Sequence, residues 1–173
     1  MRLFSYVVAR DFGFAPNPFF GVCTLATCKP IIRRVANIGD WVIGTGSGAL
    51  QRQSFLVFVM RVMKTLSYNE YWDSLIYRLK RPNLRSGLKY AFGDNIYYMD
   101  NAGHWHQEDS HHSHEGGLPN QGNISNDTQT NRVLLSEDFT YWGGYGPEIP
   151  SKYLNNNGFN ICAKRGHKSR FPI

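Results

Sequence analysis

Cysteine and long apolar runs are both scarce in this sequence of 173 residues. Its three cysteines are an odd number and form no Cys-x-x-Cys pair, which argues against a disulfide framework and against paired zinc ligands. No apolar run approaches the roughly 20 residues that cross a membrane, and no secretory leader is recognisable. We therefore expect reduced thiols, a cytoplasmic protein and no membrane partner.

Short catalytic and phosphate-binding motifs are also missing. The sequence contains no P-loop, no Gly-x-Gly-x-x-Gly, no Gly-x-Ser-x-Gly and no His-Glu-x-x-His. It also contains no internal repeat. These absences leave the catalytic residues unassigned and give no reason to expect a cofactor.

The composition is that of a folded and basic protein. Hydrophobic residues make up 42%, aromatic residues 14%, and the formal net charge is +6. A chain of this length can bury one sizeable core, so we expect a single domain over residues 1–155 and a basic C-terminal tail over residues 156–173. The positive charge favours a nucleic acid or another polyanion as partner.

The stretch around residues 38–62 organises the rest of the chain. Gly39-Asp40 predicts a turn, because glycine is free in φ and aspartate can bond its own backbone. A short strand follows over residues 41–43, and then three glycines alternate with Thr45 and Ser47. The apolar run over residues 55–62 is typical of a buried central strand. Together these elements predict a small barrel with a pocket at its rim.

Other elements follow from local patterns. Strands are expected over residues 3–9, 96–99 and 133–135, and a helical turn over residues 148–154. Ser67 with Glu70 three residues later predicts a capping box and a short helix. Arg33 and Arg34 are expected to be exposed.

A basic segment lies between residues 75 and 92, where no acidic residue occurs. Its proline, asparagine, serine and glycine residues predict an exposed loop. Arginine forks match phosphate oxygens, so this loop is the best candidate for nucleic-acid backbone contacts, although it can equally be a solvated face. The candidate residues are Arg78, Lys80, Arg81, Arg85 and Lys89.

Five of the six histidines fall between residues 103 and 117, at the start of a polar segment over residues 103–131 that predicts a long loop. Three interpretations remain open. The loop can be merely solvated, or His111 and His114 can hydrogen-bond an organic ligand, or His104, His106 and His112 can ligate a metal. A catalytic pairing of a histidine with Cys23 or Cys28 has no local motif, and buried structural cysteines are favoured.

Several longer segments resemble a known family. They are YVVARDFGFAPNPFFGVCTLATCKP, RRVANIGDWVIGTGS, LVFVMRVMKTLSYNEYW, YRLKRP, GDNIYY, HHSH and RVLLSEDFTYWGG. This order is similar to the nucleotide-modification-associated domain of the second type, found in bacterial and phage neighbourhoods concerned with modified DNA bases. The pattern GDWV…TGS…FVMRV resembles, more distantly, the EVE, YTH and ASCH groups of the PUA-like superfamily. The chain lacks the Trp-x-Gly-Val-Arg-Asn motif and the Lys/Glu pair that members of those groups carry.

The resemblance implies an α+β, mostly β fold: a PUA-like bent β-barrel with short peripheral helices and a long His-rich loop. It also implies a pocket for one flipped, modified nucleobase. The resemblance puts Trp41, Thr45, Gly46 and Ser47 on the barrel rim and Asn17, Phe19 and Phe20 in a facing loop. Tyr141 and Trp142 precede a glycine pair, and we expect them to complete an aromatic-lined pocket.

The leading interpretation is a non-enzymatic reader of a modified base or nucleotide, acting in bacterial or phage DNA modification or defence. Aromatic stacking of about 1–3 kcal/mol per base can offset the cost of unstacking it. The alternative is an enzyme of nucleobase modification or nucleic-acid cleavage that uses the His-rich segment, with or without a metal. A third interpretation is an accessory protein that contacts other proteins.

Overall fold

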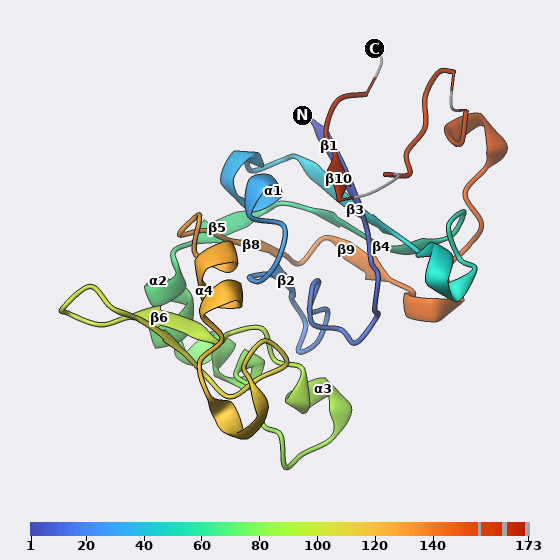
Figure 1. Cartoon of the computed structure of the whole chain (residues 1–173). Coiled ribbons are helices and arrows are strands. Elements are labelled where there is room, and N and C mark those ends of the chain that lie inside the picture. The colour runs from blue at the N-terminus through green and yellow to red at the C-terminus, as the bar shows by residue number, and fades with distance from the viewer. Residues whose placement is uncertain (156, 164–165, 172–173) are drawn as a thin grey trace. The chain divides into compact units, whose positions relative to one another are not determined.

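The structure is a computed structural model that describes residues 1–155, 157–163 and 166–171. The chain folds into two compact units, each assembled from separate stretches of sequence (Figure 1). The first unit contains Met1–Asp11, Ala36–Met63 and Ser136–Ile173, and the second contains Phe12–Val35 and Lys64–Leu135.

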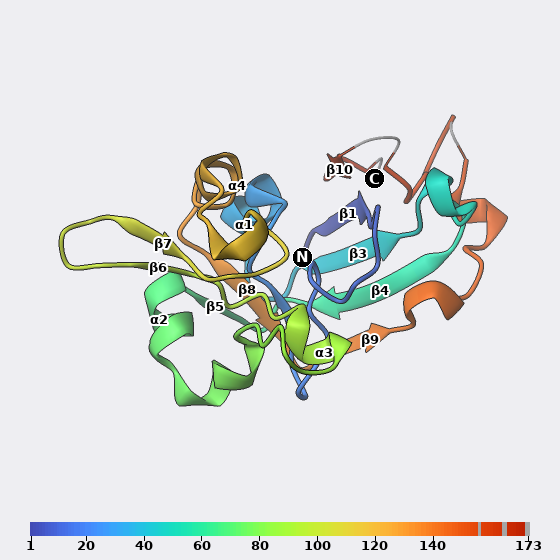
Figure 2. The same cartoon turned by 60° about the horizontal axis from the view of Figure 1, so that its bottom comes forward.

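The first unit is built on a five-stranded sheet in the order β10-β1-β3-β4-β9. The neighbouring β1, β3 and β4 lie side by side in Figure 2. β1 runs parallel to β3, and the other neighbouring pairs are antiparallel. The strands are β1 (Leu3–Val7), β3 (Trp41–Thr45), β4 (Leu56–Arg61), β9 (Phe139–Tyr141) and β10 (His167–Lys168).

Small residues let this sheet pack closely. A Cβ on Gly44 of β3 would lie 2.3 Å from the ring of Phe58 on β4, so glycine is needed for the ring to cover the strand. β3 also has a register shift between Gly44 and Thr45. Asp40 fixes the turn before β3, because it accepts bonds from the backbone N–H groups of Arg2 (2.7 Å) and Asn37 (2.9 Å).

The second unit combines a three-stranded sheet, in the order β2-β8-β5, with a β6–β7 hairpin. Its strands are β2 (Cys23–Leu25), β5 (Lys64–Leu66), β6 (Tyr97–Met99), β7 (Trp105–Gln107) and β8 (Val133–Ser136). Its helices are α1 (Pro30–Val35), α2 (Tyr68–Asp73), α3 (Leu88–Ala91) and α4 (Gln121–Asp127). α2 begins at the predicted capping box of Ser67 and Glu70.

The core of the second unit is unusually rich in tyrosine. Tyr68, Tyr71 and Tyr97 are completely or almost completely buried, and they pack with Ile96 and Val133. Buried hydroxyl groups need partners, and each of these three makes hydrogen bonds inside the unit. The expectation that Arg33 is exposed is wrong, because its side chain is fully buried.

The sequence correctly predicted the α+β class and the positions along the chain of β1, β3, β4, β6 and β8. Strands outnumber α-helices in the described residues. The closed barrel is not observed, since the described strands form open sheets. The predicted His-rich loop contains β7, a 3-10 turn over residues 115–117 and α4. In the expected tail, His167 and Lys168 pair with β1, while Lys164 and Arg165 lie outside the described residues.

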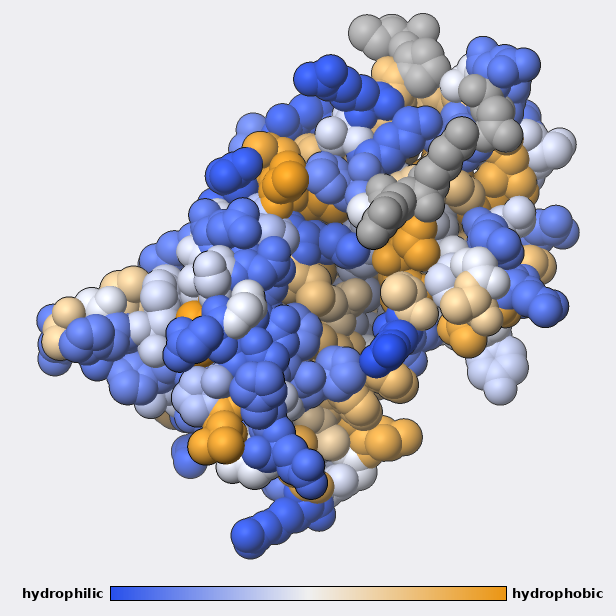
Figure 3. Space-filling model, in the orientation of Figure 1, coloured by the Kyte–Doolittle hydropathy of each residue, from blue (hydrophilic) through white to orange (hydrophobic). Residues whose placement is uncertain are grey.

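None of the described helices has the length and apolar character needed to cross a membrane. On the face seen in Figure 3, hydrophilic residues predominate over α4 and the β6–β7 hairpin of the second unit. The polar side chains buried inside this unit are therefore the candidates for a functional site.

Candidate functional site

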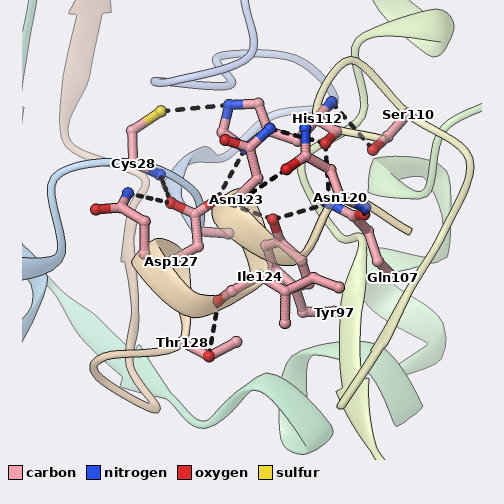
Figure 4. Close-up of polar contacts among 12 residues, drawn as sticks. Cys28, Tyr97, Gln107, Ser110, His112, Asn120, Asn123, Ile124, Asp127 and Thr128 are labelled. Atoms are coloured by element: carbon pink, nitrogen blue, oxygen red, sulfur yellow. Dashed lines mark hydrogen bonds and ion pairs between the residues drawn. The ribbon is translucent and has the colours of Figure 1, made fainter. Parts of the chain in front are cut away.

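The candidate site is built around Asp127, the last residue of α4, whose side chain is completely buried. Asn120 caps the start of this helix by accepting from the N–H of Asn123, and Ile124 anchors it in the core. The Asp127 carboxylate has four neighbours (Figure 4): Oδ1 accepts from the backbone N–H of Cys28 (2.8 Å) and from Asn126 (3.1 Å). Oδ2 accepts from the hydroxyl of Tyr97 (3.0 Å) and lies 2.8 Å from Nδ1 of His112.

His112 lies between a carboxylate and a thiol. Its Nδ1 faces Asp127, and its Nε2 lies 3.6 Å from Sγ of Cys28. The backbone carbonyl of His112 accepts from the side chains of Gln107 (3.1 Å) and Asn123 (2.8 Å). Its ring meets that of Phe14 edge-on, with 4.7 Å between the ring centroids. The imidazole is therefore fixed in both position and orientation.

Cys28 follows β2 and stands just before α1. It has a φ of 56° and Lys29 a φ of 42°, two consecutive left-handed residues that are uncommon outside glycine. This sharp turn presents the thiol toward His112 while the Cys28 N–H donates to Asp127. Cys28 is half-buried, so its sulfur combines a fixed geometry with partial access.

The buried side chain of Arg33 links the turn at Cys28 to the end of α4. Its Nε donates to the carbonyl of Cys28 (2.8 Å), and its Nη2 donates to the carbonyl of Asp127 (2.6 Å). Its Nη1 donates to the hydroxyl of Tyr68 (2.9 Å) and to the carbonyl of Arg132 (2.8 Å). Because each nitrogen of this buried guanidinium donates a hydrogen bond, Arg33 holds the turn at Cys28 and the end of α4 at a fixed distance from each other.

The charges of the site act on one another. Burial tends to lower the pKa of His112, but Asp127 and Cys28 outweigh it and raise that pKa to about 9. Burial and the adjacent Asp127 raise the pKa of Tyr97, so its hydroxyl keeps its proton as a donor. At neutral pH both ring nitrogens of His112 then carry protons, one facing the carboxylate and the other facing the sulfur.

A thiol, an imidazole and a carboxylate in this order form the arrangement of nucleophile, base and orienting group used in covalent catalysis. The same three side chains can also be viewed as a metal-binding set. However, Asp127 and Cys28 contact opposite nitrogens of one ring. A single ion binds only one of those nitrogens, so it would have to displace one of these two contacts. The geometry fits a catalytic triad better than a three-ligand metal centre.

A comparison with known families assigns almost the whole chain to one family. The family model described as nucleotide modification associated domain 2 matches residues 1–172. The chain belongs to this family. No curated protein and no solved structure matches it. Membership connects the domain with nucleotide modification.

Only some of the cations in the basic segment over residues 75–92 are exposed to solvent. Arg78, Arg85 and Lys89 are exposed. Lys80 is buried, and its ammonium donates to the carbonyl oxygens of Asn17 (2.9 Å) and Val22 (2.6 Å). Burial lowers the pKa of Lys80 to about 8. Lys80 therefore holds the interior together and does not belong to an exposed phosphate-binding surface, which corrects its predicted position.

Arg81 and the predicted pocket loop are also engaged within the second unit. The Arg81 guanidinium lies 3.5 Å from the ring centroid of Trp72 and donates to the carbonyl of that residue. The Asn17 side chain is buried and bonded to Phe92 and Lys80. Phe19 and Phe20 are half-buried. The side-chain amide of Asn17 is thus committed to the fold, which corrects its expected placement in a ligand-binding loop.

The rim residues lie in the first unit. Thr45 and Gly46 line a cavity of about 490 Å³ together with Val7, Gly48, Gln53 and Ser54. The Ser47 hydroxyl is instead buried and donates to the carbonyl of Ala9. The described lining includes none of the aromatic residues predicted for this unit, which are Trp41, Tyr141 and Trp142. Tyr141 donates its hydroxyl hydrogen bond to Asp11.

The histidines separate into three places. His104 and His106 both approach Asp100, at 3.5 and 2.8 Å, on the exposed β6–β7 hairpin. His111 packs against phenylalanine rings, and His114 is exposed. His112 alone joins the buried site. In the described residues, therefore, His104, His106 and His112 do not gather into the metal site considered from the sequence.

Sequence reasoning considered Cys28 and His112 separately and missed Asp127 and Arg33. One overlooked signal was Pro30, since proline favours the first position of a helix and so places Cys28 just before one. Asn120 was another, because it is a good N-cap residue at the start of a segment interpreted as loop. Nothing local marks Asp127, whose role depends on partners far away in the chain.

The raised pKa of His112 predicts a pH-dependent stability. Because its folded value of about 9 exceeds the ordinary 6.5, the stabilisation is complete below pH 6.5 and is lost as the pH rises through 9. The difference in unfolding free energy between the wild type and His112→Asn should shrink by at most about 3 kcal/mol over that range. Urea unfolding at several pH values measures it, and a difference independent of pH would contradict the ion pair.

Proposed function

We propose that the domain is a cysteine-dependent enzyme of nucleotide modification, with Cys28 as nucleophile, His112 as acid and base, and Asp127 as the orienting group. The observation that carries this proposal is the continuous contact from the buried carboxylate through both imidazole nitrogens to the sulfur. These contacts hold the His112 ring toward Cys28, whereas a histidine in a solvated loop would have no such fixed orientation.

The reaction class that suits this set is acyl transfer. In the reactive pair the Cys28 proton already lies on Nε2 of His112, and the sulfur electron pair forms a bond to the carbonyl carbon of an amide or ester. The bond from that carbon to its nitrogen or oxygen then breaks, and His112 returns the proton to the leaving group. Water, or an amine or hydroxyl of a second substrate, attacks the resulting thioester and restores the thiol.

Alkylation provides a direct test of the nucleophile. At pH 6.5, iodoacetamide should modify Cys28 at least about 10-fold faster than Cys162, because the Cys28 sulfur lies 3.6 Å from Nε2 of His112 and a neighbouring histidine promotes the reaction of a cysteine. Burial raises the pKa of Cys23 to about 12 and raises that of Cys162, so both should react slowly. Mass spectrometry of the peptides after timed exposure gives the three rates.

Two variants test the cause of that reactivity. His112→Asn should reduce Cys28 alkylation at pH 6.5 to the rate of Cys162, and Asp127→Asn should reduce it in part. Cys162→Ser is the matched control and should leave the Cys28 rate unchanged. Equal rates at Cys28 in the wild type and in His112→Asn would overturn the proposal. Stoichiometric zinc that blocks alkylation until a chelator removes it would favour a metal centre instead.

The reader function remains a second candidate because of the cavity in the first unit. Its volume of about 490 Å³ lies in the range of small-molecule sites. Gln53 and Ser54 line it and supply polar groups for a base edge, whereas the buried Thr45 hydroxyl donates to the carbonyl of Tyr6. This function requires binding of a modified nucleobase or nucleotide without any covalent step. Binding that survives Cys28→Ala and is weakened by Gln53→Ala would distinguish it from the enzyme.

Either function gains from contact with a nucleic-acid backbone, and the exposed cations predict how that contact responds to salt. Replacing Arg78, Arg85 and Lys89 by alanine should weaken binding to all sequences alike and reduce the slope of log K against log salt by about 2–3. A triple alanine variant of the exposed Arg61, Lys64 and Lys152 removes the same charge elsewhere. If both variants change the slope equally, the segment is only a solvated face.

A further inference from the structure

A group of aromatic rings lies beside the cysteine site in the second unit. Phe12 and Phe92 are stacked, with 4.9 Å between centroids and an interplanar angle of 14°. His111 meets both rings edge-on, at 5.2 and 5.3 Å. The Phe12 side chain nevertheless remains 42% exposed. This Phe12–Phe92–His111 platform is thus well ordered on one side and open on the other.

The platform is joined to the catalytic imidazole by direct ring contacts. His111 lies 5.3 Å from Phe14, and Phe14 lies 4.7 Å from His112. The centroids of His111 and His112 are 6.0 Å apart, at an interplanar angle of 29°. A planar group stacked on Phe12 is therefore connected to the His112–Cys28 pair through two rings, those of Phe12 and His111.

Lys29 adds a positive charge next to the sulfur. It directly follows Cys28 and is half-buried. Burial lowers the pKa of its amine, and the electrostatic interaction with Cys28 partly offsets that lowering. A cation here favours an anionic ligand, and a phosphate group has that charge.

We propose that the Phe12–Phe92–His111 platform is the base-stacking subsite of the cysteine site, and that the ligand is a nucleotide whose base lies on Phe12 and whose phosphate lies near Lys29. This inference rests on the function proposed above. Every nucleobase has a π-face that can stack on an aromatic ring, so the platform selects the class of ligand. The chemical group that meets Cys28 is set by the attached modification.

Protection of Cys28 from alkylation measures binding at this subsite. Each 2′-deoxynucleoside 5′-monophosphate is titrated during iodoacetamide treatment, beside 2-deoxyribose 5-phosphate, which has no base, and the deoxynucleosides, which have no phosphate. The alkylation rate of each variant without ligand is measured first, and protection is expressed relative to it. Mononucleotides should protect Cys28, the sugar phosphate should not, and the deoxynucleosides should protect more weakly.

Phe12→Ala should raise the mononucleotide concentration needed for half-protection by about 5- to 150-fold, the range expected for the loss of one stacking ring. Tyr145→Ala is the matched control, because Tyr145 is 96% exposed and lies in the first unit. That variant should behave as the wild type.

The outcomes separate the two proposals. Alkylation of Cys28 that does not depend on His112 overturns the enzymatic function itself. Alkylation that depends on His112 but is not slowed by mononucleotides, or is slowed equally by the sugar phosphate, overturns the stacking subsite alone. Protection that is the same in Phe12→Ala and Tyr145→Ala also overturns it. Equal protection by nucleosides and mononucleotides overturns the contribution of Lys29.

Discussion

The second unit depends on a carboxylate that it buries completely. Placing the Asp127 side chain in the interior costs several kcal/mol unless hydrogen bonds and opposite charge compensate it. The compensation comes from a backbone N–H at Cys28, a hydroxyl at Tyr97 and the His112 ring, each brought by a different segment of the chain. One buried charge thus fixes the position of three segments, and the same contacts assemble the thiol and the imidazole.

The two proposed functions rest on different units of the domain. The first unit carries an open sheet and a cavity with hydroxyl and amide groups, which suit noncovalent recognition. The second unit carries a reactive geometry, with a strained turn at Cys28 and an oriented imidazole. Backbone strain of this kind persists where surrounding contacts over-determine it, and Arg33 supplies such contacts by bonding the carbonyl of Cys28.

The sequence is most informative where structure is local. The Ser67–Glu70 capping box and the strand at residues 41–43 depend on spacing within a few residues, and both are found as predicted. The site depends on long-range partners: Cys28 and Asp127 are 99 residues apart, and Cys28 and His112 are 84 apart. Arg33 and Lys80 appear solvent-facing by composition, yet distant carbonyl groups draw both inside. The residue type alone does not show whether a polar side chain has such distant partners.

The protonation of His112 is decisive for the site, because Asp127 and Cys28 face opposite nitrogens of its ring. Nitrogen-15 chemical shifts of the histidine rings, followed from pH 5 to 10 and assigned to His112 by loss of its signals in His112→Asn, measure this directly. The account predicts that His112 titrates near its raised pKa of about 9 and keeps both protons at pH 7. A ring that titrates near 6.5, as an isolated histidine does, and is neutral at pH 7 would contradict it.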